Sequence, residues 1–464
     1  MPDTPRFDPR AARLNAARRE SDLTGLRERS ANPARGPERI DVLVIGAGVT
    51  GAGAALDAAT RGLDVLLVDA GDLGGPAGPV SPVSPGVPGG RGRPGRLGRL
   101  GGLGRPGRLA RERRILTELT APHLAGSRTG GAVPHTVPGA GTGAGTGAGT
   151  TGRRPLPARI LTLFSGHGMG HGIGYGVGHG VGAEAGHGLF RGVRHVDDGR
   201  LVAALARTAA GYGARVLTYC GATGIHTDGT VARVTLTDTL PPCTDPAPES
   251  APDSGPGSGP ATDLLREELM RPLPEVFQVE AGVIIDTTGD ATGSRIPDPG
   301  RTIPGENFPG TVTAPEVGHS GYRLVAERAV DAAARFLAGS GVTAGPCVTA
   351  STPVVGAPTA ESSAGVDPAD LDGLPTSMVG RFGCEAPEVL RDATVDNPLD
   401  TVGHSTHDID VVRAELEFHV THECALTVSD LLDRRTRIGL VPADRAACEE
   451  TAREILREVL PTLV

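Results

Sequence analysis

The chain has 464 residues and a formal net charge of −9, and all 45 of its basic residues are arginine. A chain of this length can form two or three domains with a sizeable core. Its acidic balance argues against a nucleic-acid-binding protein, and no apolar run approaches the roughly 20 residues that span a bilayer. We therefore expect a cytoplasmic protein, attached at most to the inner face of the cell membrane.

Glycine and proline dominate the composition, with 70 Gly and 40 Pro but no Trp and four Tyr. Much of this excess lies in blocks that bury too little apolar surface to offset the entropy lost on ordering. The cysteines are widely spaced without a C-x-x-C pair, which is typical of reduced cytosolic thiols and predicts neither a disulfide framework nor a metal site. They are Cys220, Cys243, Cys347, Cys384, Cys424 and Cys448.

The N-terminal tail, residues 1–38, contains a predicted polar amphipathic helix in "RAARLNAARRESDLTGLRER". Residues 42–45 form a continuous apolar run, as expected of a parallel strand buried on both faces. Gly46, Gly48 and Gly51 follow as G-x-G-x-x-G. The first glycine permits a sharp turn, the second lets the backbone approach a pyrophosphate, and the third lets the helix pack on the strand.

A helix of small residues is expected over 52–59, with Gly62 at its end, and a second apolar strand over 65–68. That strand closes on Asp69, whose carboxylate can accept hydrogen bonds from a ribose hydroxyl, while the helix N-terminus offers amide donors to phosphate. This order of elements favours a dinucleotide site over the alternative, a glycine turn that binds no ligand. Residues 39–75 are thus the first expected cofactor-binding segment.

Residues 76–190 are expected to be a low-complexity, largely disordered insert. Nine arginines lie between Arg91 and Arg114, a tract more typical of a solvated segment than of the alternative, an anion site. The stretch "RILTELTAPHL" recovers helical spacing. Four histidines stand among glycines further on, where flexible filler is favoured over metal binding because no acidic or thiol partner recurs at regular spacing. They are His167, His171, His179 and His187.

Order returns over residues 191–345, apart from a linker near 241–260. The spacing of apolar residues predicts a helix in "RLVAALARTAAG", then a strand, and a β-hairpin partner in "GTVARVTLTD". Residues 283–285 form a buried strand that runs into Thr288 and Gly289. NAD domains seldom need a late apolar strand ending in T-G, whereas two-dinucleotide-type flavoproteins place one beside the flavin. This second element therefore favours FAD.

Several blocks of the chain, in order, resemble the FAD-dependent glycerol-3-phosphate dehydrogenases of high-GC bacteria. They include "VLVIGAGVTGAGAALDAATRGLDVLLVDAGD", "LTAPHL", "VIIDTTG" and "RAELEFHVTHECALTVSDLLDRRTRIGL", in which "LLDRRTR" is expected to be exposed. The resemblance implies an α/β fold: a Rossmann-like FAD-binding domain with a reduced α+β substrate region. It also implies a C-terminal helical domain over 376–464, after a linker over 346–375.

The chain departs from the family at two motifs that face the flavin and the substrate. In place of H-G-G-L-R-Y it has "RLGRLGGLGRPGRL", with Arg105 one residue out of register. Only "VGHSGYR" survives of G-G-K-L-T-T-Y-R, so Tyr322 and Arg323 align while the lysine is absent. The family's long run of substrate strands is replaced by a turn-rich stretch between Gly289 and Tyr322. The resemblance leaves Arg105 and Arg323 as candidate catalytic residues, contacting phosphate or flavin.

The family's chemistry implies hydride transfer from C2 of glycerol 3-phosphate to flavin, giving dihydroxyacetone phosphate, with quinone as the electron acceptor. His195 and His319 are possible bases, each with an ordinary solvated histidine as the alternative. Asp197 and Asp198 are expected to be a carboxylate pair at a helix N-terminus. Two other hypotheses stay open: a catalytically impaired homologue that binds FAD at most, and a non-enzymatic interaction protein that uses the arginine-rich tract.

Overall fold

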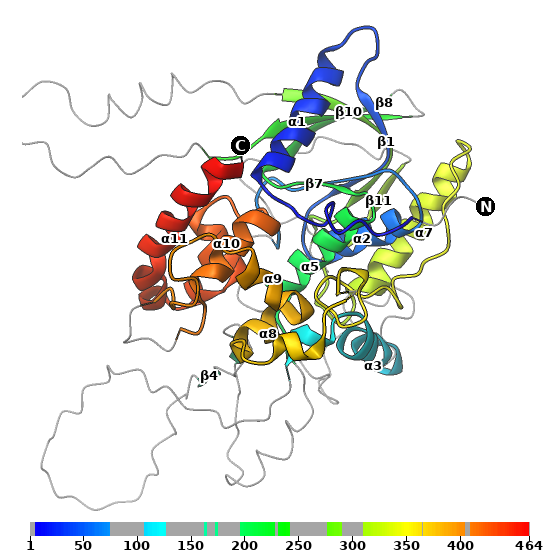
Figure 1. Ribbon diagram of the computed structural model, residues 1–464. Helices are drawn as coiled ribbons and strands as arrows, with labels where there is room; N and C mark the ends of the chain where they lie inside the picture. Colours follow the sequence, from blue (N-terminus) through cyan, green and yellow to red (C-terminus); the bar gives the residue numbers. More distant parts are fainter. Residues whose placement is uncertain are drawn as a thin grey trace, which may run out of the picture.

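The computed structural model shows a mixed β-sheet covered by helices, with the C-terminal helices α8 to α11 grouped beside it (Figure 1). No helix in the described part of the chain is long and apolar enough to cross a membrane. The described residues are 5–74, 106–126, 162–164, 172–174, 195–227, 231–241, 276–289, 310–363, 365–403 and 409–463.

The main sheet of the described residues has the strand order β7-β2-β1-β10-β9-β8, and β11 pairs with the end of β10. Strands β7, β2, β1, β10 and β11 are parallel, whereas β9 and β8 continue the sheet in antiparallel fashion. This confirms the predicted α/β class and the hairpin partner. The strands are β1 Glu38–Ile45, β2 Val65–Val68, β7 Arg215–Leu217, β8 Cys220–Thr227, β9 Ala232–Asp238, β10 Val276–Asp286 and β11 Thr311–Thr313.

Helices cover both faces of the parallel part of the sheet, which explains the continuous apolar run of β1. Val42 and Val44 pack in the core that contains α2, α5 and α7, while Leu43 and Ile45 pack in the core that contains α1. Successive side chains of a strand alternate between its faces, so each face receives apolar residues. The helices are α1 Ala16–Ala31, α2 Val49–Thr60, α5 Asp198–Gly211 and α7 Tyr322–Ala338.

The amphipathic character predicted for α1 is confirmed. Asn15 caps the helix by accepting from the Arg18 amide at 3.0 Å, and Leu23 and Leu26 are buried against the sheet. Arg19 is also buried, and its guanidinium donates to the Thr218 carbonyl oxygen at 2.8 Å. A helix of mostly polar residues thus packs on the sheet, mainly on β10, β7 and β1, through one narrow buried stripe.

Helix α2 lies between α5 and α7 and is buried along its whole length. Its small residues allow this close packing: a Cβ on Gly53 would lie 2.6 Å from the Tyr322 ring. Gly62, with φ +83°, follows the helix as predicted and leads toward β2. The closeness of α7 brings the segment before Tyr322 to the start of α2, where the cofactor turn lies.

The C-terminal segment is helical, as predicted, and contains apolar cores of its own. The expectation that "LLDRRTR" is exposed is wrong. Arg435 is 1% exposed, and its two terminal nitrogens donate to the two carboxylate oxygens of the fully buried Asp72, at 2.6 and 2.8 Å. The Arg435–Asp72 pair lies in the interior, where it joins the C-terminal helices to the loop after β2. The elements are α8 Thr376–Phe382, α9 Ala386–Arg391, α10 Arg413–His422, η7 Asp430–Arg435 and α11 Pro442–Leu463.

The predicted insert, 76–190, is described only in part. Its described portion contains α3 Pro106–Arg114 and η2 Ile115–Thr120, in line with the helical spacing of that stretch, and the two short strands β4 Thr162–Phe164 and β5 Gly172–Gly174. The tract before α3, including Arg105, and the four histidines lie outside the described residues.

The segment between β10 and α7 contributes one short strand, β11, to the cofactor sheet. Residues 290–309 lie outside the described part of the chain. In the expected linker, 346–375, Val354 and Val355 are buried in the core that contains α2, and the short helices η4 Glu361–Ser363 and η5 Pro368–Leu371 follow. Part of the expected linker thus belongs to the core on the α2 face of the sheet.

Candidate cofactor and active site

The glycine turn between β1 and α2 is shaped by contacts that exclude side chains. Gly46 has φ +103°, a conformation that favours glycine, and Gly48 is the N-cap of α2. A Cβ on Gly51 would lie 1.8 Å from the Gly46 carbonyl oxygen, so the helix can pack this closely on the turn only with glycine there. Gly46 and Gly51 therefore have the turn conformation and the close packing that their spacing predicts.

Asp69 lies at the end of β2 and holds the turn in place. Its Oδ2 accepts from the Ala47 amide at 2.6 Å, and its Oδ1 accepts from the Gly71 amide at 2.8 Å. The side chain is half-buried, beside the carboxyl ends of β1 and β2. Open parallel sheets bind ligands at this edge. Asp69 thus lies at the strand end where the sequence predicts it.

The end of β10 lies against the glycine turn because β10 pairs in parallel with β1. Thr288 donates from its amide and its hydroxyl to the Asp286 carboxylate, at 3.0 and 2.7 Å. Thr287, which the sequence reading passed over, makes the direct contact: its hydroxyl approaches the carbonyl oxygens of Ile45 and Gly46 at 3.0 and 2.9 Å.

A carboxylate occupies the start of α2. The Glu316 oxygens lie 3.4 and 3.3 Å from the Thr50 amide nitrogen. Its backbone amide donates to the Gly289 carbonyl oxygen at 2.8 Å. Burial raises the pKa of Glu316 to about 7, although hydrogen bonds from Thr50 and the Val49 amide act to lower it. Sequence reasoning missed this residue because only the fold brings it to the glycine turn.

Arg323 is the second residue of α7, and carboxylates surround its guanidinium. Its Nε and Nη2 donate to the two carboxylate oxygens of Glu112 from α3, at 2.5 and 2.9 Å, and Nη1 lies 3.1 Å from Glu327. Glu112 is buried and the Arg323 side chain is 12% exposed. The one predicted catalytic arginine that the structure describes is therefore held by a bidentate ion pair.

Of the two histidines considered as bases, His319 has a carboxylate partner. Its Nδ1 lies 3.1 Å from Oδ1 of Asp198, and its side chain is 11% exposed. Asp197 is the N-cap of α5, accepting from the Gly199 and Arg200 amides, so its expected place at a helix N-terminus is confirmed. His195 lies in strand β6, His195–Val196, paired with Gly126.

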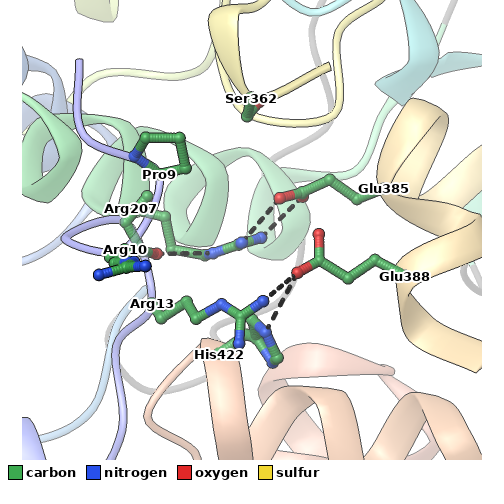
Figure 2. A pocket seen from close by; sticks show the side chains of 9 residues that line it. Pro9, Arg10, Arg13, Arg207, Ser362, Glu385, Glu388 and His422 are labelled. Atoms are coloured by element: carbon green, nitrogen blue, oxygen red, sulfur yellow. Dashed lines mark hydrogen bonds and ion pairs between the residues drawn. The ribbon is translucent and has the colours of Figure 1, made fainter. Parts of the chain in front are cut away.

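A cavity of about 330 Å³ lies between the N-terminal segment, α5 and the C-terminal helices (Figure 2). Opposite charges are paired along its wall: Arg207 donates to both oxygens of Glu385 at 2.8 Å, and Arg13 contacts Glu388. None of the three predicted turn glycines nor Asp69 lines it.

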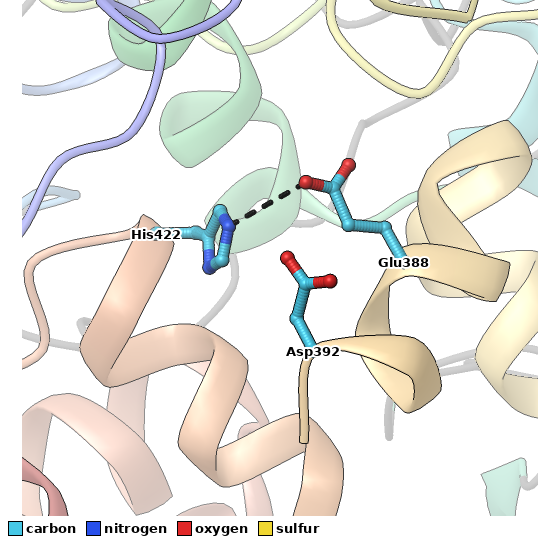
Figure 3. Close-up of side chains that lie close together, drawn as sticks. All are labelled: Glu388, Asp392 and His422. Atoms are coloured by element: carbon cyan, nitrogen blue, oxygen red, sulfur yellow. Dashed lines mark ion pairs between the residues drawn. The ribbon is translucent and has the colours of Figure 1, made fainter. Parts of the chain in front are cut away.

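Glu388, Asp392 and His422 meet in this region with ligand atoms within 4.8 Å of one another (Figure 3). The Arg13 guanidinium contacts both carboxylates, reaching Asp392 at 3.3 Å. Pairing with His422, together with the positive charges of Arg13 and Arg207, lowers the pKa of Glu388 to about 2. The Arg13 guanidinium thus balances the negative charge of the two carboxylates in this cluster.

Comparisons with known proteins identify relatives of this chain. A model of FAD-dependent oxidoreductases matches residues 41–245, and a model of the C-terminal domain of alpha-glycerophosphate oxidase matches residues 347–462. The glycerol-3-phosphate dehydrogenases 1 of Mycobacterium bovis and Mycobacterium tuberculosis are each 33% identical over 543 aligned positions, which cover 97% of this chain and 99% of the relative.

The chain belongs to the FAD-dependent glycerol-3-phosphate dehydrogenase family. A solved structure of the enzyme from Bacillus halodurans, complexed with FAD, aligns with 97% of this chain and 98% of its own. That alignment has 16% identity and a TM-score of 0.48. Family membership confirms the resemblance found in the sequence and the FAD-dependent oxidoreductase class.

The turn of this glycerol-3-phosphate dehydrogenase relative fits the phosphate end of FAD in its backbone. Because glycines have no side chains, they leave the backbone amides at the start of α2 accessible to phosphate. Asp69 lies at the end of the neighbouring strand β2. The side chain that does not fit is Glu316. A Cβ on Gly48 would lie 2.6 Å from Glu316 Oε2, so the carboxylate covers the glycine that a pyrophosphate must approach.

Proposed function

We propose that the chain binds FAD at the β1–α2 turn and oxidises glycerol 3-phosphate at C2 to dihydroxyacetone phosphate. The observation that carries this proposal is the 33% identity to glycerol-3-phosphate dehydrogenases over nearly the whole of both chains. The glycine turn, with Asp69 at the adjoining strand end, supports it by offering a backbone fitted to a dinucleotide. Quinone, at the membrane surface, is the proposed electron acceptor.

When bound, FAD supplies the hydride acceptor for this oxidation. The protein must then remove the proton of the C2 hydroxyl, and His319 is the proposed base. Its Nδ1 faces the Asp198 carboxylate at 3.1 Å, which orients the ring and leaves Nε2 to accept a proton. His319 is three residues after Glu316 in the segment that leads into α7, and its carboxylate partner Asp198 begins α5.

A second candidate function is a homologue that binds FAD but turns over poorly. The observation that favours it is the bidentate pair between Arg323 and the buried Glu112. A substrate phosphate would have to replace a carboxylate that already matches the guanidinium in geometry and charge. The absence of lysine from the chain adds to this, since no lysine can supply the missing charge.

An anaerobic titration separates the two candidates. The protein is reconstituted with FAD, and the visible flavin absorbance is recorded as glycerol 3-phosphate is added. Bleaching supports the dehydrogenase, and reoxidation by a soluble quinone analogue supports the proposed acceptor. A bound flavin that stays oxidised supports the impaired homologue instead.

The proposed base is tested by the His319→Gln variant in the same assay. We expect a loss of about 10²- to 10⁴-fold in the rate of flavin reduction, because that is the usual contribution of a general base. The matched control is His226→Gln, which changes an exposed histidine on β8. An unchanged rate in His319→Gln would exclude His319 as the base.

A further inference from the structure

The Glu316 carboxylate lies where the phosphates of a dinucleotide would lie. Both of its oxygens face the Thr50 amide at the start of α2, and Oε2 lies over the second glycine of the turn. Helix α2 has 12 residues, so its N-terminus offers unpaired amides and the positive end of a dipole. A carboxyl group of the protein therefore lies on the amide that a pyrophosphate would use.

Hydrogen bonds hold the backbone around Glu316 in place, whereas in the described part of the chain its carboxylate is held only by contacts with the start of α2. The Glu316 amide donates to the Gly289 carbonyl oxygen, the Thr50 hydroxyl donates to the Pro315 carbonyl oxygen at 3.3 Å, and the Val317 amide donates to the Thr50 hydroxyl at 3.3 Å. These bonds join the segment before α7 to the glycine turn. Rotation about the side-chain bonds of Glu316 is then the smallest movement that exposes the Thr50 amide.

We propose that Glu316 is an internal occupant of the cofactor's phosphate site and that FAD binds only by displacing its carboxylate. This inference rests on the proposed function, because it concerns the same site. The Glu316 carboxylate and a pyrophosphate would compete for the same amides at one helix N-terminus, because Glu316 Oε2 already lies beside Gly48. The affinity for FAD is consequently lower than it would be if the glycine turn had no carboxylate beside it. The side chain at position 316 determines how much affinity is lost.

The test compares FAD binding to the full-length protein and to Glu316→Gly and Glu316→Gln, measured by quenching of flavin fluorescence. Hydrogen bonds to a charged group contribute enough that we expect Kd to fall about ten- to hundredfold in Glu316→Gly. Glu316→Gln keeps the size but not the charge and should fall between the two. Glu454→Gln, which changes an exposed carboxylate on α11, is the matched control and should bind as the unaltered protein does.

Titration with ADP, which carries a pyrophosphate without a flavin, identifies the affected part of the site. ADP should gain affinity in Glu316→Gly by a factor similar to that of FAD. The rise in Tm on adding FAD should be larger in Glu316→Gly than in the unaltered protein. Circular dichroism confirms that each variant is folded.

The outcomes separate this inference from the proposed function. Equal FAD and ADP affinities in the unaltered protein and Glu316→Gly, with only a change in Tm, would make Glu316 a structural cap and overturn the inference alone. Tighter ADP binding without any FAD reduction by glycerol 3-phosphate would uphold the inference and count against the dehydrogenase. Failure of every variant to bind either ligand would overturn both.

Discussion

Replacing Gly51 by alanine tests whether the glycine turn is shaped for the close contact that the structure shows. The added Cβ would lie 1.8 Å from the Gly46 carbonyl oxygen, whereas carbon and oxygen atoms in contact need about 3.3 Å. The start of α2 must therefore move away from the turn by about 1.5 Å. Thr287 Oγ1 lies 2.8 Å from the same Cβ position, so the added carbon is too close to a second oxygen as well.

We expect Gly51→Ala to lower the free energy of unfolding by about 1–3 kcal/mol, the usual cost of inserting a group into a close-packed site. The shift should also weaken FAD binding by at least about tenfold, because the amides at the start of α2 leave their positions. Urea unfolding measures the first quantity and flavin fluorescence the second. The FAD affinity is compared at a temperature where both proteins are folded.

Gly25→Ala is the matched control, since Gly25 lies within α1 and a Cβ there meets nothing within 4 Å. Alanine replaces glycine in a helix interior, so this variant should gain up to about 1 kcal/mol of stability and keep its FAD affinity. A Gly51→Ala protein with unchanged stability and unchanged FAD affinity would refute the reasoning, because the turn would then tolerate a side chain at its closest contact.

Three further predictions concern charged groups. Arg435→Met should cost about 3–5 kcal/mol in urea unfolding, because it leaves Asp72 buried without its partner, and adding Asp72→Asn should recover part of the loss. Burial lowers the pKa of His419 from its ordinary 6.5 to about 4, so the unfolded state takes up a proton first as the pH falls. Stability that is complete above pH 6.5 should decrease by about 2 kcal/mol at pH 5, and His419→Gln should remove that part of the pH dependence; an unaltered slope would count against it. Glu112→Gln should release Arg323 and lower KM for glycerol 3-phosphate about tenfold with little change in kcat, and an unchanged KM would show that Arg323 does not bind the phosphate.

The cofactor half of the molecule could be predicted from the sequence because its signals are local. Short-range patterns located β1, the glycine turn and β2, since the geometry of the turn depends on residues a few positions apart. The resemblance to a family added the C-terminal helices. Thr288 and Gly289 were placed at the end of a buried strand, and β10 does bring them to the turn.

The contacts of the site could not be predicted because they join distant segments. Glu316 reaches the Thr50 amide only through the packing of α7 against α2, and Glu112 meets Arg323 across more than two hundred residues. Polar runs also mislead: "LLDRRTR" has the composition of a surface segment, yet Arg435 is buried by a carboxylate that lies 363 positions away. Local patterns carry no information about such partners.

The Arg435–Asp72 pair also governs how the chain can come apart. Asp72 follows the cofactor strand β2 by four residues, and Arg435 belongs to the C-terminal helices. Separating the two regions would leave Asp72 and Arg435 each without its partner. Unfolding of one region therefore destabilises the other. The FAD-type domain and the helical domain should therefore melt in a single cooperative transition, and a chain shortened before α8 would lose the integrity of its cofactor loop together with its last domain.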